Sequence, residues 1–277
     1  MHFPAKRMDG SSFEPFAAVY DAIRPDYPPE VLTALLQEFG CGSATKVLEI
    51  GAGTGLATRH ILETGAVCHA IEPGENLLAI ARQKLQKFPS LTLQQESFED
   101  LEPAGDFDLV VAATAFHWLN PRDRFAKVDA HLKKQGGLLL VWNTFCTSQG
   151  RAAQAVVKFH NAFFPDRETS NPNEKALNKL LGREQEIRDS HLFFAESTRR
   201  ALTLYEYTAP QYCALLQTFP EISTLAEDQR AGFLSEVAAI IDHNGGRIDI
   251  PVLTSGFLCR RITDFVDSLS YAKGRPN

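Results

Sequence analysis

The stretch VLEIGAGTG, residues 47–55, decides the fold. A short, mostly apolar segment (45–50) has the composition of a strand and ends at glycines in positions 51, 53 and 55, after which residues 56–63 are typical of a helix. Glycine lets the backbone turn tightly and lets a ligand approach without a Cβ atom in the way. Open α/β sheets bind their ligands at the carboxyl ends of strands, so we predict a ligand-binding loop here.

Strand-like and helix-like segments alternate around this loop. Strands are predicted at 45–50, 66–71, 91–95, 107–113 and 138–142, separated by helices at 56–63, 76–88 and 120–134, with Gly136-Gly137 as a break. Such alternation indicates right-handed βαβ crossovers and a parallel sheet with helices on both faces. We therefore predict an α/β, doubly wound, mostly parallel sheet.

The second half of the chain is less regular. We predict a helix at 151–164, a polar surface excursion at 165–182, strands at 201–207 and 247–261, and helices at 211–219 and 228–243. The helices at 211–219 and 228–243 lie between the last two strands, which gives the fold a helical insertion near the C-terminus.

Composition limits the classes of function. The 277 residues are 44% hydrophobic and carry a net charge of −6, which excludes a disordered chain and gives little reason to bind nucleic acid. No run approaches the roughly 18–20 apolar residues of a membrane span, and no signal peptide is visible. The five scattered cysteines form no metal-ligand pattern. We expect a cytoplasmic, metal-free protein without membrane or nucleic-acid partners.

The chemistry of the loop favours one ligand over its competitors. A dinucleotide fingerprint would need glycine at position 56, which is Leu56, and a P-loop would need Gly-Lys-Ser/Thr. Glu49 places an anion where a ligand ammonium group would suit better than a pyrophosphate. Glu72 ends the next strand, where a carboxylate can accept hydrogen bonds from a ribose diol. S-adenosylmethionine carries the ammonium group, a sulfonium and the diol.

Five segments carry a family resemblance: 47–55, IEPGENLL (71–78), ESFEDL (96–101), FDLVVAATAFHWL (107–119) and LKKQGGLLLVWN (132–143). In order and spacing they resemble the class I S-adenosylmethionine-dependent methyltransferases. FAAVYDAIRPDYP (16–28) and AFHWL resemble the small-molecule branch that includes trans-aconitate methyltransferase. The resemblance implies a seven-stranded Rossmann-like methyltransferase fold and one domain over 1–277. Its parts would be an N-terminal cofactor cover (1–30), a cofactor-binding core (45–143) and a helical substrate-side insertion (208–244).

The resemblance also implies positions for the cofactor site. The residues expected to bind the methionine half and the ribose and adenine are Glu49, Gly51, Ala52, Gly53, Gly55, Glu72, Pro73, Ser97 and Phe98. Backbone carbonyls of Thr114 to His117, Phe116 included, would pass under the sulfonium. Tyr20, Arg24 and Tyr27 would close over the cofactor.

The implied reaction is methyl transfer to a small molecule at oxygen, either a carboxylate or a hydroxyl. Alignment for in-line displacement supplies much of the acceleration, and a carboxylate acceptor needs no general base. His117 is the tentative catalytic residue, and Tyr27, His117 and Trp118 are the expected substrate contacts. A structural role for His117 stays open, as do a non-catalytic S-adenosylmethionine binder, a nicotinamide-dependent oxidoreductase, and the choice between monomer and homodimer.

Overall fold

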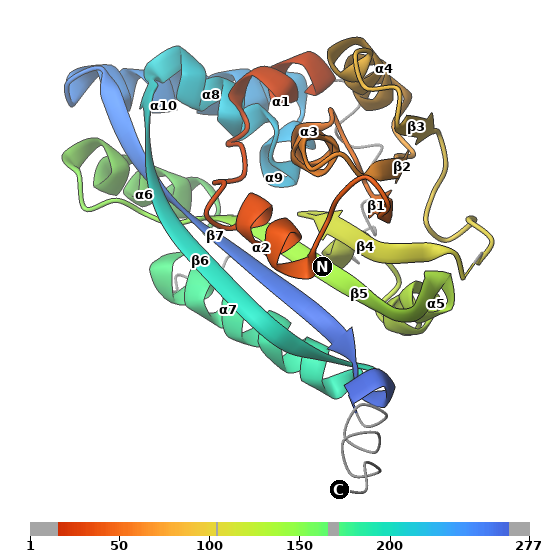
Figure 1. Cartoon of the computed structure of the whole chain (residues 1–277). Coiled ribbons are helices and arrows are strands. Elements are labelled where there is room, and N and C mark those ends of the chain that lie inside the picture. Colours follow the sequence, from red (N-terminus) through yellow and green to blue (C-terminus); the bar gives the residue numbers. More distant parts are fainter. Residues whose placement is uncertain (1–15, 104, 166–171, 266–277) are drawn as a thin grey trace, which may run out of the picture.

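The computed structural model describes residues 16–103, 105–165 and 172–265. Within these ranges seven strands form one sheet in the order β3-β2-β1-β4-β5-β7-β6 (Figure 1). The strands are β1 (Lys46–Ile50), β2 (Val67–Ile71), β3 (Leu91–Gln94), β4 (Phe107–Ala113), β5 (Leu132–Phe145), β6 (Phe193–Thr208) and β7 (Arg247–Arg261). β1 to β5 pair in parallel, and β7 is antiparallel to both β5 and β6. The predicted fold class is confirmed.

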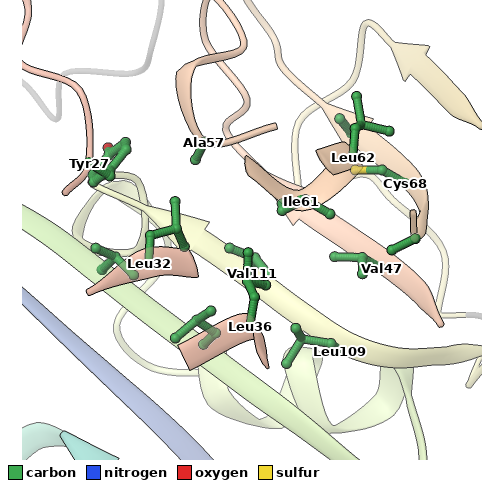
Figure 2. Packing of buried hydrophobic residues seen from close by; sticks show 14 of the residues in the cluster. Tyr27, Leu32, Leu36, Val47, Ala57, Ile61, Leu62, Cys68, Leu109 and Val111 are labelled. Atoms are coloured by element: carbon green, nitrogen blue, oxygen red, sulfur yellow. The ribbon is translucent and has the colours of Figure 1, made fainter. Parts of the chain in front are cut away.

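Helices cover both faces of the sheet. They are α1 (Ala17–Ile23), α2 (Leu32–Phe39), α3 (Leu56–Glu63), α4 (Glu75–Leu85), α5 (Arg124–His131), α6 (Arg151–Phe163), α7 (Pro172–Asp189), α8 (Ala209–Gln217), α9 (Pro220–Ser223) and α10 (Glu227–His243). Val47 packs with α2, α3 and α4, whereas its neighbour Leu48 packs with α5 and α7 on the opposite face. Figure 2 shows the first of these cores, in which Leu36 and Ile61 meet the strands. Successive residues of β1 therefore face opposite cores, as expected for a strand buried on both faces.

The boundary between α5 and β5 differs from the prediction. The helix ends at His131, and β5 runs from Leu132 through the glycine pair at 136 and 137 that was expected to break the chain. A Cβ atom on Gly137 would lie 2.7 Å from a ring carbon of Phe39. This glycine therefore permits close packing of α2 on the sheet rather than a turn.

The surface excursion predicted at 165–182 is wrong from residue 172 onward, because α7 occupies 172–189; residues 166–171 lie outside the described ranges. Ala176, Leu180 and Ile187 are buried at helical spacing on the inner face of α7. An ion pair between Arg124 and Glu186 fixes the helix further. The apolar positions are few among many polar ones, so sequence periodicity did not reveal the helix.

The helices α8, α9 and α10 connect β6 to β7. Thr208 pairs with Arg247 at the end of this hairpin, and Phe145 at the carboxyl end of β5 pairs with Val252 near the start of β7. The insertion therefore rises from the edge of the sheet at which β5 ends. There α8 contacts α1, so the N-terminal segment and the insertion face each other (Figure 1).

Candidate active site

The glycine loop is held tightly on the sheet and presents one open side. The amides of Gly51 and Ala52 donate to the carbonyl of Ile71 at 2.9 and 3.0 Å. Gly51 has φ 69°, and a Cβ atom there would lie 2.6 Å from that of Ala115. Gly53 has φ 57°, but a Cβ atom there would meet nothing within 4 Å. The backbone at Gly53 therefore faces space that a ligand can enter.

Glu72 joins the loop to the end of β2. Its side chain is buried, and its two oxygens accept the amides of Gly53 and Gly74, each at 2.9 Å. These two hydrogen bonds fix the orientation of the Glu72 carboxylate, which can only accept when ionised. This places an anionic acceptor beside the open side of the loop, as a ribose diol requires.

Glu49 is the unusual group of the loop. It is 1% exposed, and among the described residues its Oε2 has no hydrogen-bond partner. Burial raises the pKa of Glu49 to about 7, and the nearby charge of Glu72 acts in the same direction. A buried ionised carboxylate is costly without a partner. Glu49 is therefore suited to a cationic ligand group, such as the ammonium of S-adenosylmethionine.

A cavity of about 30 Å³ lies at Glu49, and we call it the loop cavity. Its wall includes Tyr20 and Tyr27 of the N-terminal segment together with Gly51 and Gly53. The space suffices only for a water-sized group. This cavity alone does not hold a molecule of the size of S-adenosylmethionine.

Residues 16–30, the described part of the predicted cover, are anchored on both sides of the loop; residues 1–15 lie outside the described ranges. The hydroxyl of Tyr27 donates to Thr114 Oγ1 at 3.0 Å. Thr114 has φ 56°, an uncommon value for a β-branched residue and a frequent mark of functional sites. Asn143 donates to the carbonyl of Pro25 at 3.0 Å, and Asp26 is paired with Arg59 of α3.

Arg24 joins the cover to the insertion. Its Nε donates to Thr218 Oγ1 at 2.9 Å, and a terminal nitrogen donates to the Thr218 carbonyl at 2.7 Å. The guanidinium lies over the rings of Phe219 and Tyr20 at 4.6 and 4.9 Å, and burial lowers its pKa. In this structure Arg24 lines a second, larger cavity rather than the loop cavity.

This large cavity has a volume of about 750 Å³. The ends of β4 and β5, the helices α6 and α7, and the insertion contribute its walls. Predicted site residues in these walls are Tyr20, Arg24, Thr114, His117 and Trp118. Tyr20 lines both cavities, so the loop cavity and the large cavity meet at its side chain.

Comparisons with known proteins agree with this geometry. Residues 47–136 match a family model described as a methyltransferase domain. The chain carries a class I, S-adenosylmethionine-dependent methyltransferase domain. An uncharacterized methyltransferase of Mycobacterium bovis is 34% identical to it over 135 residues, 48% of this chain and 52% of the relative.

Two further comparisons concern the chemistry and the fold of the methyltransferase domain. A malonyl-[acyl-carrier protein] O-methyltransferase of Bacillus cytotoxicus is 27% identical over 155 residues, 55% of this chain and 51% of that protein. A structure from Anaeromyxobacter dehalogenans, provisionally assigned as a type II methyltransferase, covers 86% of this chain and 97% of its own with TM-score 0.56 and 19% identity. This structure shows the fold alone. The chain spans about half the length of the curated relatives it matches.

Three other predicted site residues, Phe116, Phe98 and Ser97, make contacts within the methyltransferase domain and line neither the loop cavity nor the large cavity. Phe116 packs against Phe125 with ring centres 4.8 Å apart, and its carbonyl accepts a hydrogen bond from Arg124 at 2.7 Å. Phe98 is buried in the same core, and Ser97 Oγ lies 2.6 Å from an Asp100 oxygen. The Phe116 and Phe98 side chains therefore stabilise the methyltransferase domain beneath the site.

His117 is held as a neutral hydrogen-bond donor. The indole N–H of Trp142 lies 3.3 Å from His117 Nδ1 and can only donate, so Nδ1 accepts and the ring proton resides on Nε2. Partial enclosure by protein lowers the pKa of His117 to about 4, and the cations Arg183 and Lys179 act in the same direction. At neutral pH this arrangement suits donation to a substrate oxygen better than proton abstraction.

Several residues of the large cavity have no counterpart in the predicted site. His160 Nε2 lies 3.2 Å from Glu221 Oε1, and Asn143, Lys179 and Arg183 also line the walls. The pair joins α6 to α9 and involves residues 61 positions apart, which no local motif reveals. The sequence does contain one feature that could have revealed Arg183, because this cation lies close to the apolar positions of α7.

Among the described residues no helix is long and apolar enough to cross a membrane. Within the same ranges no group of three or more acidic, histidine or cysteine side chains is placed to hold a metal ion.

Proposed function

We propose that this protein transfers the methyl group of S-adenosylmethionine to an oxygen of a small molecule bound in the large cavity. The observation that carries the proposal is the buried Glu49 carboxylate, whose Oε2 has no partner among the described residues, beside a glycine loop whose Gly53 side is open. Glu49 would bind the ammonium group of the cofactor and Glu72 its ribose diol. Gly51, Ala52 and Gly55 shape the loop, and Pro73, Ser97 and Phe98 follow at the adenine side.

Positioning supplies most of the proposed catalysis. S-adenosylmethionine supplies, when bound, a methyl group that its sulfonium already activates. Tyr20, which lines both cavities, and Thr114, which lines the large one, would orient an acceptor oxygen toward that group. Closure of the cover over the loop would exclude water. His117 would donate to the acceptor through Nε2, with Trp118 and Tyr27 as neighbouring contacts.

Two observations support oxygen as the acceptor atom. The Nδ1 of His117 is occupied by Trp142, so this ring offers no base to deprotonate an acceptor. A carboxylate acceptor arrives deprotonated and needs none. The relative from Bacillus cytotoxicus is named an O-methyltransferase. We further propose that residues 1–277 form one domain, with a cover at 1–30, a core at 45–143 and a substrate-side insertion at 208–244.

Calorimetric titration with S-adenosylmethionine, S-adenosylhomocysteine and NAD tests the cofactor. We expect binding of both sulfur compounds and none of NAD. Gly53→Arg should abolish that binding, because the new side chain fills the open side of the loop. Gly40→Arg is the matched control, since Gly40 also has a positive φ and free space around its Cβ position but lies at the end of α2. Absence of affinity for either sulfur compound in the wild type would refute the proposal.

Release of S-adenosylhomocysteine in a screen of small acceptors then separates an enzyme from a non-catalytic binder. An enzyme yields acceptor-dependent product, and Gly53→Arg yields none. A protein that binds the cofactor but shows no turnover with any acceptor would support the non-catalytic alternative.

A further inference from the structure

One wall of the large cavity carries two cations that lack acidic partners. Lys179 and Arg183 are one helical turn apart on α7, and both line the cavity. Arg183 donates to Thr144 Oγ1 at 3.1 Å, and its guanidinium lies 4.4 Å from the centre of the Trp142 ring. Within the described ranges neither cation forms an ion pair. A guanidinium has five N–H donors, so most of those of Arg183 remain available.

Several arginines of the described residues pair with carboxylates, as in Arg199 with Glu38 and Arg260 with Glu196, whereas Arg183 lines a cavity without such a partner. The chain has an excess of acidic residues, so partners are not scarce. Burial lowers the pKa of Arg183 to about 10, which reflects the cost of holding its charge there. A partly buried cation without a carboxylate is stabilised when a ligand supplies the anion.

The packing of α7 against the rest of the protein fixes where Lys179 and Arg183 lie. Leu180 and Ile187 pack into the core beneath the helix, and Glu186 pairs with Arg124 of α5. The Trp142 ring packs against the guanidinium of Arg183, and its indole N–H orients His117 by donating to Nδ1. Lys179, Arg183 and the Nε2–H of His117 therefore offer donors along the same side of the cavity.

The rest of the cavity does not cancel this charge. Arg24 adds a further cation to the lining, and two of its nitrogens donate to Thr218. The carboxylate of the lining is that of Glu221, which lies 3.2 Å from His160 on the wall formed by α6 and α9. The large cavity is therefore electropositive inside an acidic protein.

We propose that Lys179, Arg183 and the Nε2–H of His117 bind an anionic group of the methyl acceptor, so that the acceptor is a small organic carboxylate or phosphate. This inference rests on the proposed function, because it concerns the acceptor side of the same site. The anion would anchor one end of the acceptor at α7, and the remainder of the molecule would extend toward Tyr20, where the two cavities meet.

Tryptophan fluorescence offers a test that does not depend on turnover. The chain has two tryptophans, Trp118 in the cavity lining and Trp142 under Arg183, so an anion bound here should change the emission. The probes are glutarate against glutaramide, and glycerol 3-phosphate against glycerol, at constant ionic strength. Each titration is run with and without S-adenosylhomocysteine. We expect saturable changes with at least one anion and none with its neutral counterpart.

Charge-removing variants locate the binding. Arg183→Gln and Lys179→Gln should each weaken the anion about 10- to 100-fold, as loss of a charge-assisted hydrogen bond does. Arg188→Gln is the matched control, because it removes a cation from the exposed face of the same helix, where Arg188 contacts Gln185. Lys179 is exposed, so its variant tests the proposal even if Arg183→Gln fails to fold.

The outcomes separate the two proposals. A response to glutarate alone or to glycerol 3-phosphate alone supports anion binding and identifies the group. The proposed anion site would be overturned by equal responses to the neutral probes or by no saturable response to either anion. Equal affinities in Arg183→Gln, Lys179→Gln and Arg188→Gln would also overturn it. Failure of S-adenosylhomocysteine to bind in calorimetry would refute the proposed function alone, because the anion titrations without it still report on α7.

Discussion

At the scale of single residues, Glu49 is the group whose ionisation matters most. Its carboxyl is buried without a partner for Oε2, and burial raises its pKa to about 7, with Glu72 adding to the shift. The carboxyl is therefore about half protonated at neutral pH without a ligand. A cationic ligand favours the ionised form, so binding and proton release are linked.

This linkage predicts a pH-dependent cofactor affinity. Below pH about 7 the proton on Glu49 must leave before an ammonium group can bind, so the affinity for S-adenosylhomocysteine should fall by up to about tenfold per pH unit. Above pH 7 the affinity should level off. Calorimetry in buffers of different ionisation enthalpy should show protons released at pH 6 and few at pH 8.

Glu49→Gln is the control for the pH effect. It should bind about 10-fold or more weakly at pH 8, because the ammonium loses its charged partner. Its affinity should vary little between pH 6 and 8. A wild-type protein whose affinity is constant over this range would show that Glu49 does not bind the ammonium group.

At the scale of elements, residues 16–30 of the proposed cover are held beside the glycine loop by contacts with other parts of the chain. The hydroxyl of Tyr27 donates a hydrogen bond to Thr114, and the side chain of Asn143 donates one to the Pro25 carbonyl. Asp26 forms an ion pair with Arg59 and lies 3.1 Å from His60. The loop cavity beneath has space only for a water-sized group. We expect these anchors to release when the cofactor enters and leaves, as in lid-gated sites.

Loosening one anchor should change rates more than affinity. Asp26→Asn removes the charge that pairs with Arg59, and the pair is partly exposed, so the structural cost is about 1 kcal/mol or less. We expect association and dissociation of S-adenosylhomocysteine to accelerate together, by about threefold or more, in stopped-flow tryptophan fluorescence.

Glu63→Gln supplies the comparison for Asp26→Asn. It removes the second carboxylate bound to Arg59, at 3.0 Å, but Glu63 belongs to α3 and does not anchor the cover. Its rates should equal those of the wild type. Equal acceleration in both variants would mean that Arg59, rather than the cover, controls entry.

At the scale of the whole molecule, the two cavities are built by different parts of the chain. Residues of the glycine loop line the loop cavity, whereas α6, α7 and the insertion contribute walls of the large cavity. The net charge of −6 is a sum over the whole sequence, so it does not reveal the electropositive lining of the large cavity. Mutations in the insertion should therefore change the choice of acceptor without changing cofactor binding.

Replacement of the insertion tests this separation. Thr208 and Arg247 are paired neighbours, so an Asn-Gly turn can join them in place of residues 209–246. We expect calorimetry to show S-adenosylhomocysteine binding within about tenfold of the wild type, while turnover of the acceptor is lost. Loss of cofactor binding in a folded protein, judged by circular dichroism, would contradict the prediction.

A milder variant guards against unfolding, because removing the insertion exposes apolar residues such as Ile248 and Ile250. Tyr212→Ala alters one wall of the large cavity from α8. It should raise KM for the acceptor about tenfold and leave cofactor affinity within about threefold.

The sequence by itself determined the core and the cofactor loop. The bounds of α3 and β4 match the prediction, and the order of strands and helices around the loop follows from periodicity alone. The loop residues 49 to 55 are neighbours in the chain, so their shared chemistry is visible without a fold. Local patterns sufficed because these features depend on adjacent residues.

Only the tertiary structure decided the acceptor side. The contact of Arg24 with Thr218 spans 194 positions, and that of Asn143 with Pro25 spans 118. The neutral state of His117 depends on Trp142 and on cations from α7, a helix whose sparse apolar stripe is visible only once it lies on the sheet. Such contacts arise from long-range packing, and no periodicity or motif in one segment specifies which distant segment will lie against it.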